Sequence, residues 1–154
     1  MNSSLSRRHL LGVAGAGAAS AGFALVVTPV KATETDAHAY LAELAGSGDW
    51  ADDGIVSLDT PEIAENGNTV PVGVMVDSPM TEDNYVKAVH LAADGNPSPQ
   101  VASFFFTPQC GECAASTRIR LAQTQNLVAV AELSDGSLHT VARQVKVTIG
   151  GCGG

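Results

Sequence analysis

The feature of this 154-residue chain that most restricts its fold is a regular alternation of valine with other residues. Val70, Val72, Val74 and Val76 stand at every second position, so a strand through them has one apolar face. Similar short runs recur along the chain and are separated by turn signals such as Asp94-Gly95-Asn96-Pro97. Short strands at such intervals are typical of two sheets packed face to face. The sequence therefore predicts an all-β sandwich.

About seven strands are expected after a short helix. Pro71 has no N–H to donate to a sheet, which predicts an edge position for its strand. Asn66-Gly67 predicts a tight hairpin. Leu41 and Leu44 have helical spacing, with Asp36 as the expected cap. The predicted helix covers residues 36–45, and the predicted strands cover residues 55–58, 69–77, 85–92, 101–107, 116–122, 128–133 and 138–149.

The first 32 residues resemble a twin-arginine export signal. Ser6-Arg7-Arg8-His9-Leu10-Leu11 is followed by an apolar stretch rich in glycine and alanine, and Val30-Lys31-Ala32 resembles a cleavage site. A membrane anchor is the alternative, because the apolar stretch approaches the roughly 20 residues that span a bilayer. The glycines and alanines favour a cleaved signal. We therefore expect a periplasmic protein with no membrane segment after signal removal.

The charge restricts the class of partner. The formal net charge is −8, and loss of Arg7, Arg8 and Lys31 with the signal leaves −11 (−8 − 3). Such an acidic surface repels nucleic acid, anionic lipid and small inorganic anions. Nucleic acid is therefore excluded as an expected partner.

The chain ends in Gly150-Gly151-Cys152-Gly153-Gly154, directly after the last predicted strand. These residues offer no apolar side chain for anchoring, and glycine is costly to order, which predicts a flexible arm. At roughly 3.3–3.6 Å per residue, Cys152 reaches about 10 Å from Ile149. The tail supplies neither a helix N-terminus nor a cation that would lower the pKa of the thiol. Cys152 is therefore expected to be accessible but to need activation by a partner.

From about residue 55 onward the chain resembles the SoxY family of sulfur carriers. The resemblance rests on the Gly-Gly-Cys-Gly-Gly tail after a Val-x-Val-Thr-Ile strand and on several internal motifs. These are Ile63-Ala64-Glu65-Asn66-Gly67 with Val70-Pro71-Val72, Asp77-Ser78-Pro79-Met80-Thr81, Asn96-Pro97-x-Pro99, Phe104-x-Phe106-Thr107-Pro108 and Thr117-Arg118-x-Arg120-Leu121-Ala122.

The resemblance implies an immunoglobulin-like β-sandwich over residues 33–149, a signal over 1–32 and a carrier arm over 150–154. It implies a heterodimer with SoxZ, which would be exported with this chain. The heme-containing SoxAX would join thiosulfate to Cys152, the manganese-dependent SoxB would release sulfate, and SoxCD, where present, would oxidise the remaining sulfane. The chain itself would be no enzyme and would bind no cofactor or metal. Cys152 would be the covalent attachment site.

Cys110-Gly111-Glu112-Cys113 is outside the family pattern. In an oxidising compartment a local disulfide between Cys110 and Cys113 is the first expectation. A reactive pair that exchanges with Cys152 or with a redox partner is an alternative, although no helix N-terminus follows Cys113. Metal binding is a third alternative, but a second ligand pair is missing.

The other polar residues are expected to be structural. His38, His90 and His139 share no spacing that suggests metal ligation. Arg118 and Arg120 would share one face of a strand and pair with acids on this chain or on SoxZ. Two other functions stay open: a periplasmic thiol-disulfide protein that uses Cys110 and Cys113, and a ubiquitin-like carrier that holds sulfur on its terminal Gly-Gly. A purely structural sandwich domain is a further alternative.

Overall fold

The computed structural model describes residues 31–150, and the signal predicted for residues 1–32 therefore lies almost wholly outside the described residues. The described part is mainly β-structure with one α-helix, α1 (Glu34–Ala45), and one 3-10 turn, η1 (Pro108–Cys110). Within residues 31–150, no helix is both long and apolar enough to cross a membrane.

Helix α1 begins two residues earlier than the spacing predicted. Thr33 is the N-cap, with its hydroxyl accepting from the Asp36 N–H at 3.2 Å, and the Asp36 carboxylate accepts from the Thr33 N–H at 2.8 Å. Asp36 is thus the third residue of the helix, where it completes a capping box, and is not the cap itself. The hydrogen bonds from Thr33 also lower the pKa of the Asp36 carboxyl.

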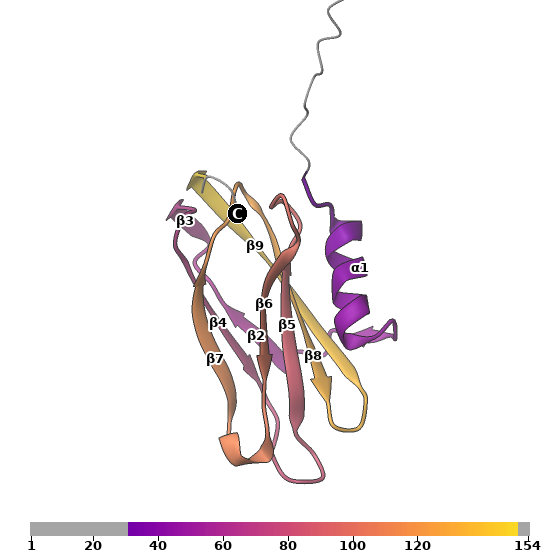
Figure 1. Cartoon of the computed structure of the whole chain (residues 1–154). Helices are drawn as coiled ribbons and strands as arrows, with labels where there is room; N and C mark the ends of the chain where they lie inside the picture. Colours follow the sequence, from indigo (N-terminus) through magenta and orange to yellow (C-terminus); the bar gives the residue numbers. More distant parts are fainter. Residues whose placement is uncertain (1–30, 151–154) are drawn as a thin grey trace, which may run out of the picture.

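Nine strands form two sheets (Figure 1). The larger sheet has the order β1-β9-β8-β5-β6, with β3 also paired to β9, and the smaller sheet has the order β2-β4-β7. The strands are β1 (Trp50–Ala51), β2 (Val56–Asp59), β3 (Ile63–Asn66), β4 (Val70–Val76), β5 (Val86–Ala93), β6 (Gln100–Phe105), β7 (Cys113–Ile119), β8 (Gln125–Leu133) and β9 (Leu138–Ile149).

The prediction of an all-β, immunoglobulin-like sandwich is confirmed, and each of the seven predicted strands has a counterpart. The prediction missed β1 and β3, which have two and four residues and pair in parallel with β9. Strand β7 begins and ends three residues before the predicted stretch, because Cys113 already pairs with Val76.

Two local predictions were wrong. The Asn66-Gly67 turn does not close a hairpin, because β3 pairs with β9 while β4 pairs with β2 and β7, so the turn crosses between the sheets. Pro71 lies in β4, the central strand of its sheet. The missing N–H is tolerated there because the β2–β4 ladder ends at the Asp59–Gly73 pair, and Gly73 is two residues beyond Pro71 in the chain.

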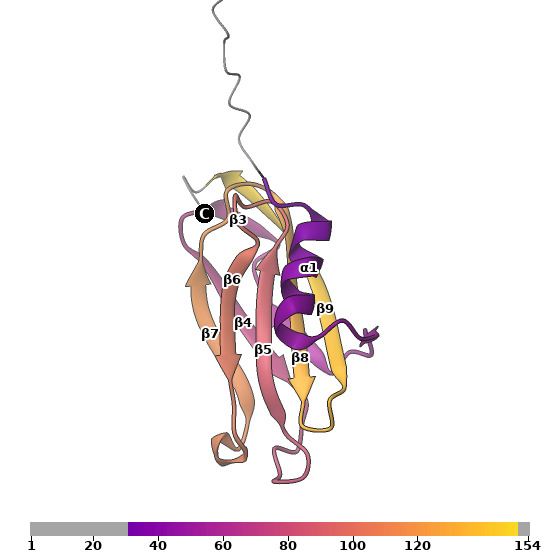
Figure 2. The same ribbon diagram turned by 45° about the vertical axis from the view of Figure 1, so that its right-hand side comes forward.

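The predicted valine alternation forms the core between the sheets. The four alternating valines of β4 are at most 3% exposed and face the large sheet, where Leu91 and Leu127 are fully buried. Burial of each such side chain contributes about 1.5–3 kcal/mol to folding. A second cluster seats α1 on the outer face of the large sheet through Leu41, Ala92 and Val130 (Figure 2). The rigid sandwich fixes where β9 ends.

Candidate functional site

The site begins where β9 ends and the carrier tail starts. Asn66 of β3 pairs with Ile149, the last residue of β9, and the Gly67 N–H donates to the Ile149 carbonyl at 2.8 Å. The Leu121 N–H in turn donates to the Gly67 carbonyl at 2.8 Å. These bonds join the end of β9 to the loop between β7 and β8. The tail therefore leaves the sandwich from a defined place.

Gly150, the first residue of the predicted arm, is held against this loop. A Cβ added at Gly150 would lie 2.2 Å from the Ala122 carbonyl oxygen, far closer than any real contact. Only a residue without a side chain fits there. The other residues of the predicted carrier site, Cys152 and its neighbours Gly151, Gly153 and Gly154, lie outside the described residues.

A buried amide network holds the loop that Gly150 contacts. Asn96 is 3% exposed, and its side chain donates to the Arg120 carbonyl and accepts from the Ala122 N–H, both at 2.9 Å. Gln125, 4% exposed, donates to the same Asn96 oxygen at 2.8 Å and accepts from the Gly95 N–H at 2.7 Å. Both buried side-chain amides have hydrogen-bond partners, so the network holds the loop between β7 and β8 in one conformation.

Arg118 and Arg120 lie at the same end of the molecule. Arg118 is the penultimate residue of β7, and Arg120 follows the strand; both are exposed. The ion pairs among residues 31–150 are Lys87–Glu132 and His139–Asp53, so neither arginine pairs with an acid of the described chain. Pairing with an acid of this chain, one of the two expected pairings, is thus not formed among residues 31–150, and pairing with SoxZ stays a prediction.

Cys110 and Cys113 are two free thiols in this structure, and the predicted disulfide is not formed. Cys110 is exposed in η1, whereas Cys113 is 1% exposed and lies in the core opposite Val76. Gly111, with φ 72°, turns the chain between them. Desolvation raises the pKa of the Cys113 thiol to about 11, so Cys113 is a poor nucleophile at neutral pH.

The cysteine pair is also far from the arm. Cys113 pairs with Val76 and Ile119 with Val70, so the six residue steps from Cys113 to Ile119 span about 20 Å at ~3.4 Å each. Figures 1 and 2 show the turn between β6 and β7 at the opposite end of the sandwich from the end of β9. Cys152 reaches only about 7 Å from Gly150. Exchange between Cys152 and Cys113 of one folded chain is therefore excluded by distance.

The three histidines have separate structural contacts. His38 stacks on Trp50 with ring centroids 4.1 Å apart, and His139 bonds to Asp53 at 3.0 Å. His90 is 4% exposed, its Nδ1 lies 2.8 Å from the Ser103 hydroxyl, and burial lowers its pKa. Within residues 31–150, no three His, Cys, Asp or Glu side chains gather closely enough to hold a metal ion.

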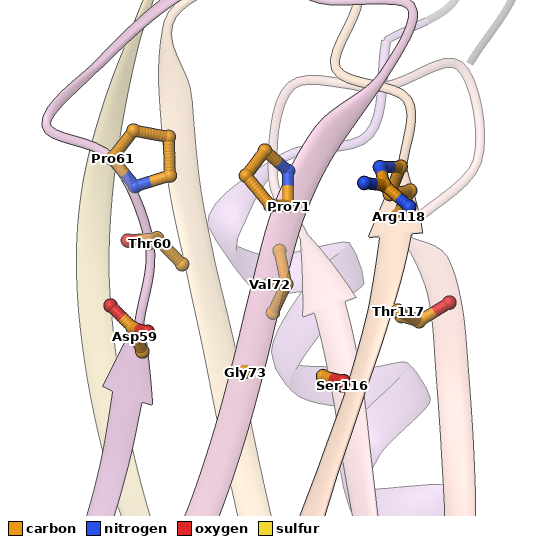
Figure 3. A pocket seen from close by; sticks show the side chains of 9 residues that line it. All are labelled: Asp59, Thr60, Pro61, Pro71, Val72, Gly73, Ser116, Thr117 and Arg118. Atoms are coloured by element: carbon orange, nitrogen blue, oxygen red, sulfur yellow. The ribbon is translucent and has the colours of Figure 1, made fainter.

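The sequence did not predict a hollow of about 770 Å³ on the outer face of the small sheet (Figure 3). Gly73 of β4 forms part of its floor, and Asp59 and Arg118 come from the strands on either side. Its lining includes the hydroxyls of Ser116 and Thr117 and the Asp59 carboxylate, but no cysteine or histidine. The feature of the sequence that could have indicated this hollow is Gly73, the glycine between Val72 and Val74.

The described chain is thus a two-sheet β-sandwich whose last strand leads into a glycine fixed against the loop after β7. A sequence profile described as sulfur oxidation protein SoxY matches residues 41–152. The chain belongs to the SoxY family of sulfur carriers in sulfur oxidation. The solved sulfur carrier protein SoxY from Chlorobium limicola f thiosulfatophilum is 35% identical, with a TM-score of 0.63 over 75% of this chain and 98% of that chain.

Other solved structures share the fold alone. Superoxide reductase (neelaredoxin) from Ignicoccus hospitalis is 18% identical, with a TM-score of 0.55 over 75% of this chain and 94% of that chain. No curated protein sequence matched the chain.

Proposed function

We propose that this chain carries thiosulfate-derived sulfur covalently on Cys152 and presents it to partner enzymes of sulfur oxidation. The observation that carries the proposal is the family match, which extends as far as residue 152. The described structure supports it at one point: Gly150 leaves the sandwich in a fixed position against Ala122. The residues that follow Gly150 are those of the proposed arm.

The proposed loading step forms an S–S bond between the Cys152 thiolate and the outer sulfur of thiosulfate. Two electrons leave in this step, and the heme-containing SoxAX is their proposed acceptor. The manganese-dependent SoxB would then add water across the bond to the terminal sulfonate, releasing sulfate and leaving a protonated persulfide on Cys152. Where SoxCD is present, it would oxidise the remaining sulfane and take up the electrons. The chain itself supplies the attachment atom and its position.

The charge of the chain explains why a covalent bond suits this task. Thiosulfate is a small dianion with little apolar surface, and the chain has a net charge of −8. Ordinary contacts with such a surface would bind it weakly. A covalent link removes this difficulty and keeps partly oxidised sulfur on the protein.

We also propose export to the periplasm by the twin-arginine route, with SoxZ as the partner in a heterodimer. Cleavage after Ala32 would preserve helix α1, because the capping box starts at Thr33 and a free amino group there can still donate to Asp36. It would remove the hydrogen bond from the Ala32 N–H to the Asn96 carbonyl. The folded domain therefore tolerates the proposed cleavage site.

The thiol-disulfide alternative has less support. Cys113 is buried, burial raises its pKa to about 11, and η1 has only three residues. A redox-active pair needs an accessible thiolate, usually at the start of a helix. The disulfide between Cys110 and Cys113 stays a prediction for the oxidised protein.

Reconstitution with the partner enzymes tests the proposal. Thiosulfate-dependent reduction of the heme acceptor should be lost in Cys152→Ser and kept in Cys110→Ser, which removes the exposed thiol of the described residues. The proposal fails if Cys152→Ser retains full activity or if Cys110→Ser loses it. Circular dichroism of both variants should match the parent, since Cys110 is exposed and Cys152 follows the last strand in the sequence.

A further inference from the structure

Two unpaired arginines lie beside the root of the proposed arm. Arg120 is separated from Ala122 by one residue, and Gly150 contacts the Ala122 carbonyl. Arg118 is two residues further back, at the end of β7. Both side chains are exposed, and both lack an acidic partner among residues 31–150. The two arginines thus place positive charge on the surface of a chain whose net charge is −8.

The arginines share a hollow that contains no acid. The hollow measures about 240 Å³ and lies along the seam between β6 and β7. Its lining consists of neutral polar and apolar residues besides the two arginines: Asn96, Gln100, Val101, Ala102, Thr117 and Ile119. The nearby Asp94 carboxylate is engaged by Asn126, which donates to it from its N–H at 2.8 Å and its side chain at 2.7 Å. Asp59 shares the larger hollow on the small sheet with Arg118, and Glu65 lies on β3 beside the end of β9.

The proposed arm can reach the arginines. Two residues lead from Gly150 to Cys152, a span of at most about 7 Å at 3.3–3.6 Å per residue. Arg120 lies within about 7.6 Å of Ala122 between Cα atoms, at ~3.8 Å per peptide. A thiosulfonate adds two further sulfur atoms beyond Sγ, and an arginine side chain adds its own length. The terminal sulfonate can therefore reach the guanidinium group of Arg120, and Arg118 lines the same hollow.

We propose that Arg118 and Arg120 form a dock for the terminal sulfonate of the thiosulfonate on Cys152. Guanidinium groups match the planar spacing of two anionic oxygens and stay charged at every physiological pH. Hydrolysis removes the sulfonate and with it the group that the arginines bind. The dock thus holds the arm after loading and releases it after sulfate leaves. This inference rests on the proposed function, since it concerns the species carried on Cys152.

The test uses a chemically prepared adduct, so that it needs no partner enzyme. Tetrathionate reacts with the Cys152 thiolate to give the thiosulfonate and one thiosulfate. The exported protein is used as purified, with any partner that accompanies it, in a Cys110→Ser background. Nuclear magnetic resonance follows the Nε–H signals of the two arginines and the amide signals of Leu121 and Ala122. Three states are compared: free thiol, thiosulfonate and a neutral carbamidomethyl cap.

The dock predicts shifts of both arginine signals in the thiosulfonate state alone. At about 1 M salt, where the Debye length falls to about 3 Å, the shifts should largely disappear. The shift at Ala122 should be lost in Arg118→Gln combined with Arg120→Gln and kept in Arg143→Gln, an exposed arginine on β9. The dock would be overturned if the arginine signals were the same in all three states. It would also be overturned if the neutral cap shifted these signals as much as the thiosulfonate does. Absence of sulfur on Cys152 in cells would overturn the proposed function. The dock would still be tested separately, because the tetrathionate adduct is prepared chemically.

Discussion

Replacement of Asn96 by alanine tests whether the amide network fixes the loop at the root of the arm. The change removes the partner of the Arg120 carbonyl and of the Ala122 N–H, each bonded at 2.9 Å. It also removes one bond of Gln125, which keeps a second bond to the Gln123 carbonyl at 3.1 Å. Two backbone groups thus lose their partner inside the protein, at about 1–3 kcal/mol each. Water will enter part of the space, so we expect a loss of about 3 kcal/mol in the free energy of unfolding.

Urea unfolding followed by far-ultraviolet circular dichroism measures this loss. With a slope of about 1–3 kcal/mol per molar urea, the midpoint should fall by about 1–3 M. Asn68→Ala is the matched control, because Asn68 is exposed and its side chain bonds only to Asn66; it should change stability by less than about 0.5 kcal/mol. A loss below about 1 kcal/mol for Asn96→Ala would refute the assignment of the network as the support of this loop.

Further predictions concern the cysteines, the buried histidine and the first arm residue. At about pH 8, iodoacetamide should label Cys110 and spare Cys113, whose pKa burial raises to about 11; equal labelling by mass spectrometry would contradict the structure. Burial lowers the pKa of His90 from 6.5, so the unfolded chain takes the proton first and stability should fall as the pH drops below 6.5. His90→Gln should flatten that part of the urea-unfolding profile, and an unchanged profile would count against it. Gly150→Ala should speed amide exchange at the end of β9, whereas Gly48→Ala, whose new Cβ makes an ordinary 3.5 Å contact, should not; equal exchange would refute the close approach.

The fold was predictable because its main signal is local. The alternating valines of β4 and the turn after β5 depend on neighbours in sequence, and the structure confirms them. The strands β1 and β3 were missed because they have only two and four residues. Pro71 was misplaced because the length of the neighbouring β2, which decides whether its missing N–H matters, cannot be read from the sequence of β4.

The surroundings of the arm could not be predicted, because they depend on contacts between distant segments. Nothing in the tail indicates that Gly150 meets Ala122, or that Asn96 fixes the loop between them. The tail itself contains no cation, and the two arginines come from the earlier strand β7 and the loop after it. Strand pairing brings Arg118 and Arg120 to the same end of the sandwich as the end of β9.

The contrast between the two cysteine regions also depends on tertiary structure. Cys110 and Cys113 look equivalent in sequence, but strand β7 turns Cys113 into the core while Cys110 stays in solvent. Their position at the far end of the sandwich separates them from the proposed carrier chemistry. Any role of this pair is therefore independent of Cys152 within one chain.

Mass spectrometry of the protein from thiosulfate-grown cells tests the central claim most directly. The account predicts adducts of sulfane or thiosulfonate mass on Cys152, absent in cells grown without a sulfur source of this kind. Sulfur on the carboxylate of Gly154 would instead support a ubiquitin-like carrier. Absence of sulfur from Cys152 in thiosulfate-grown cells would contradict the proposed function.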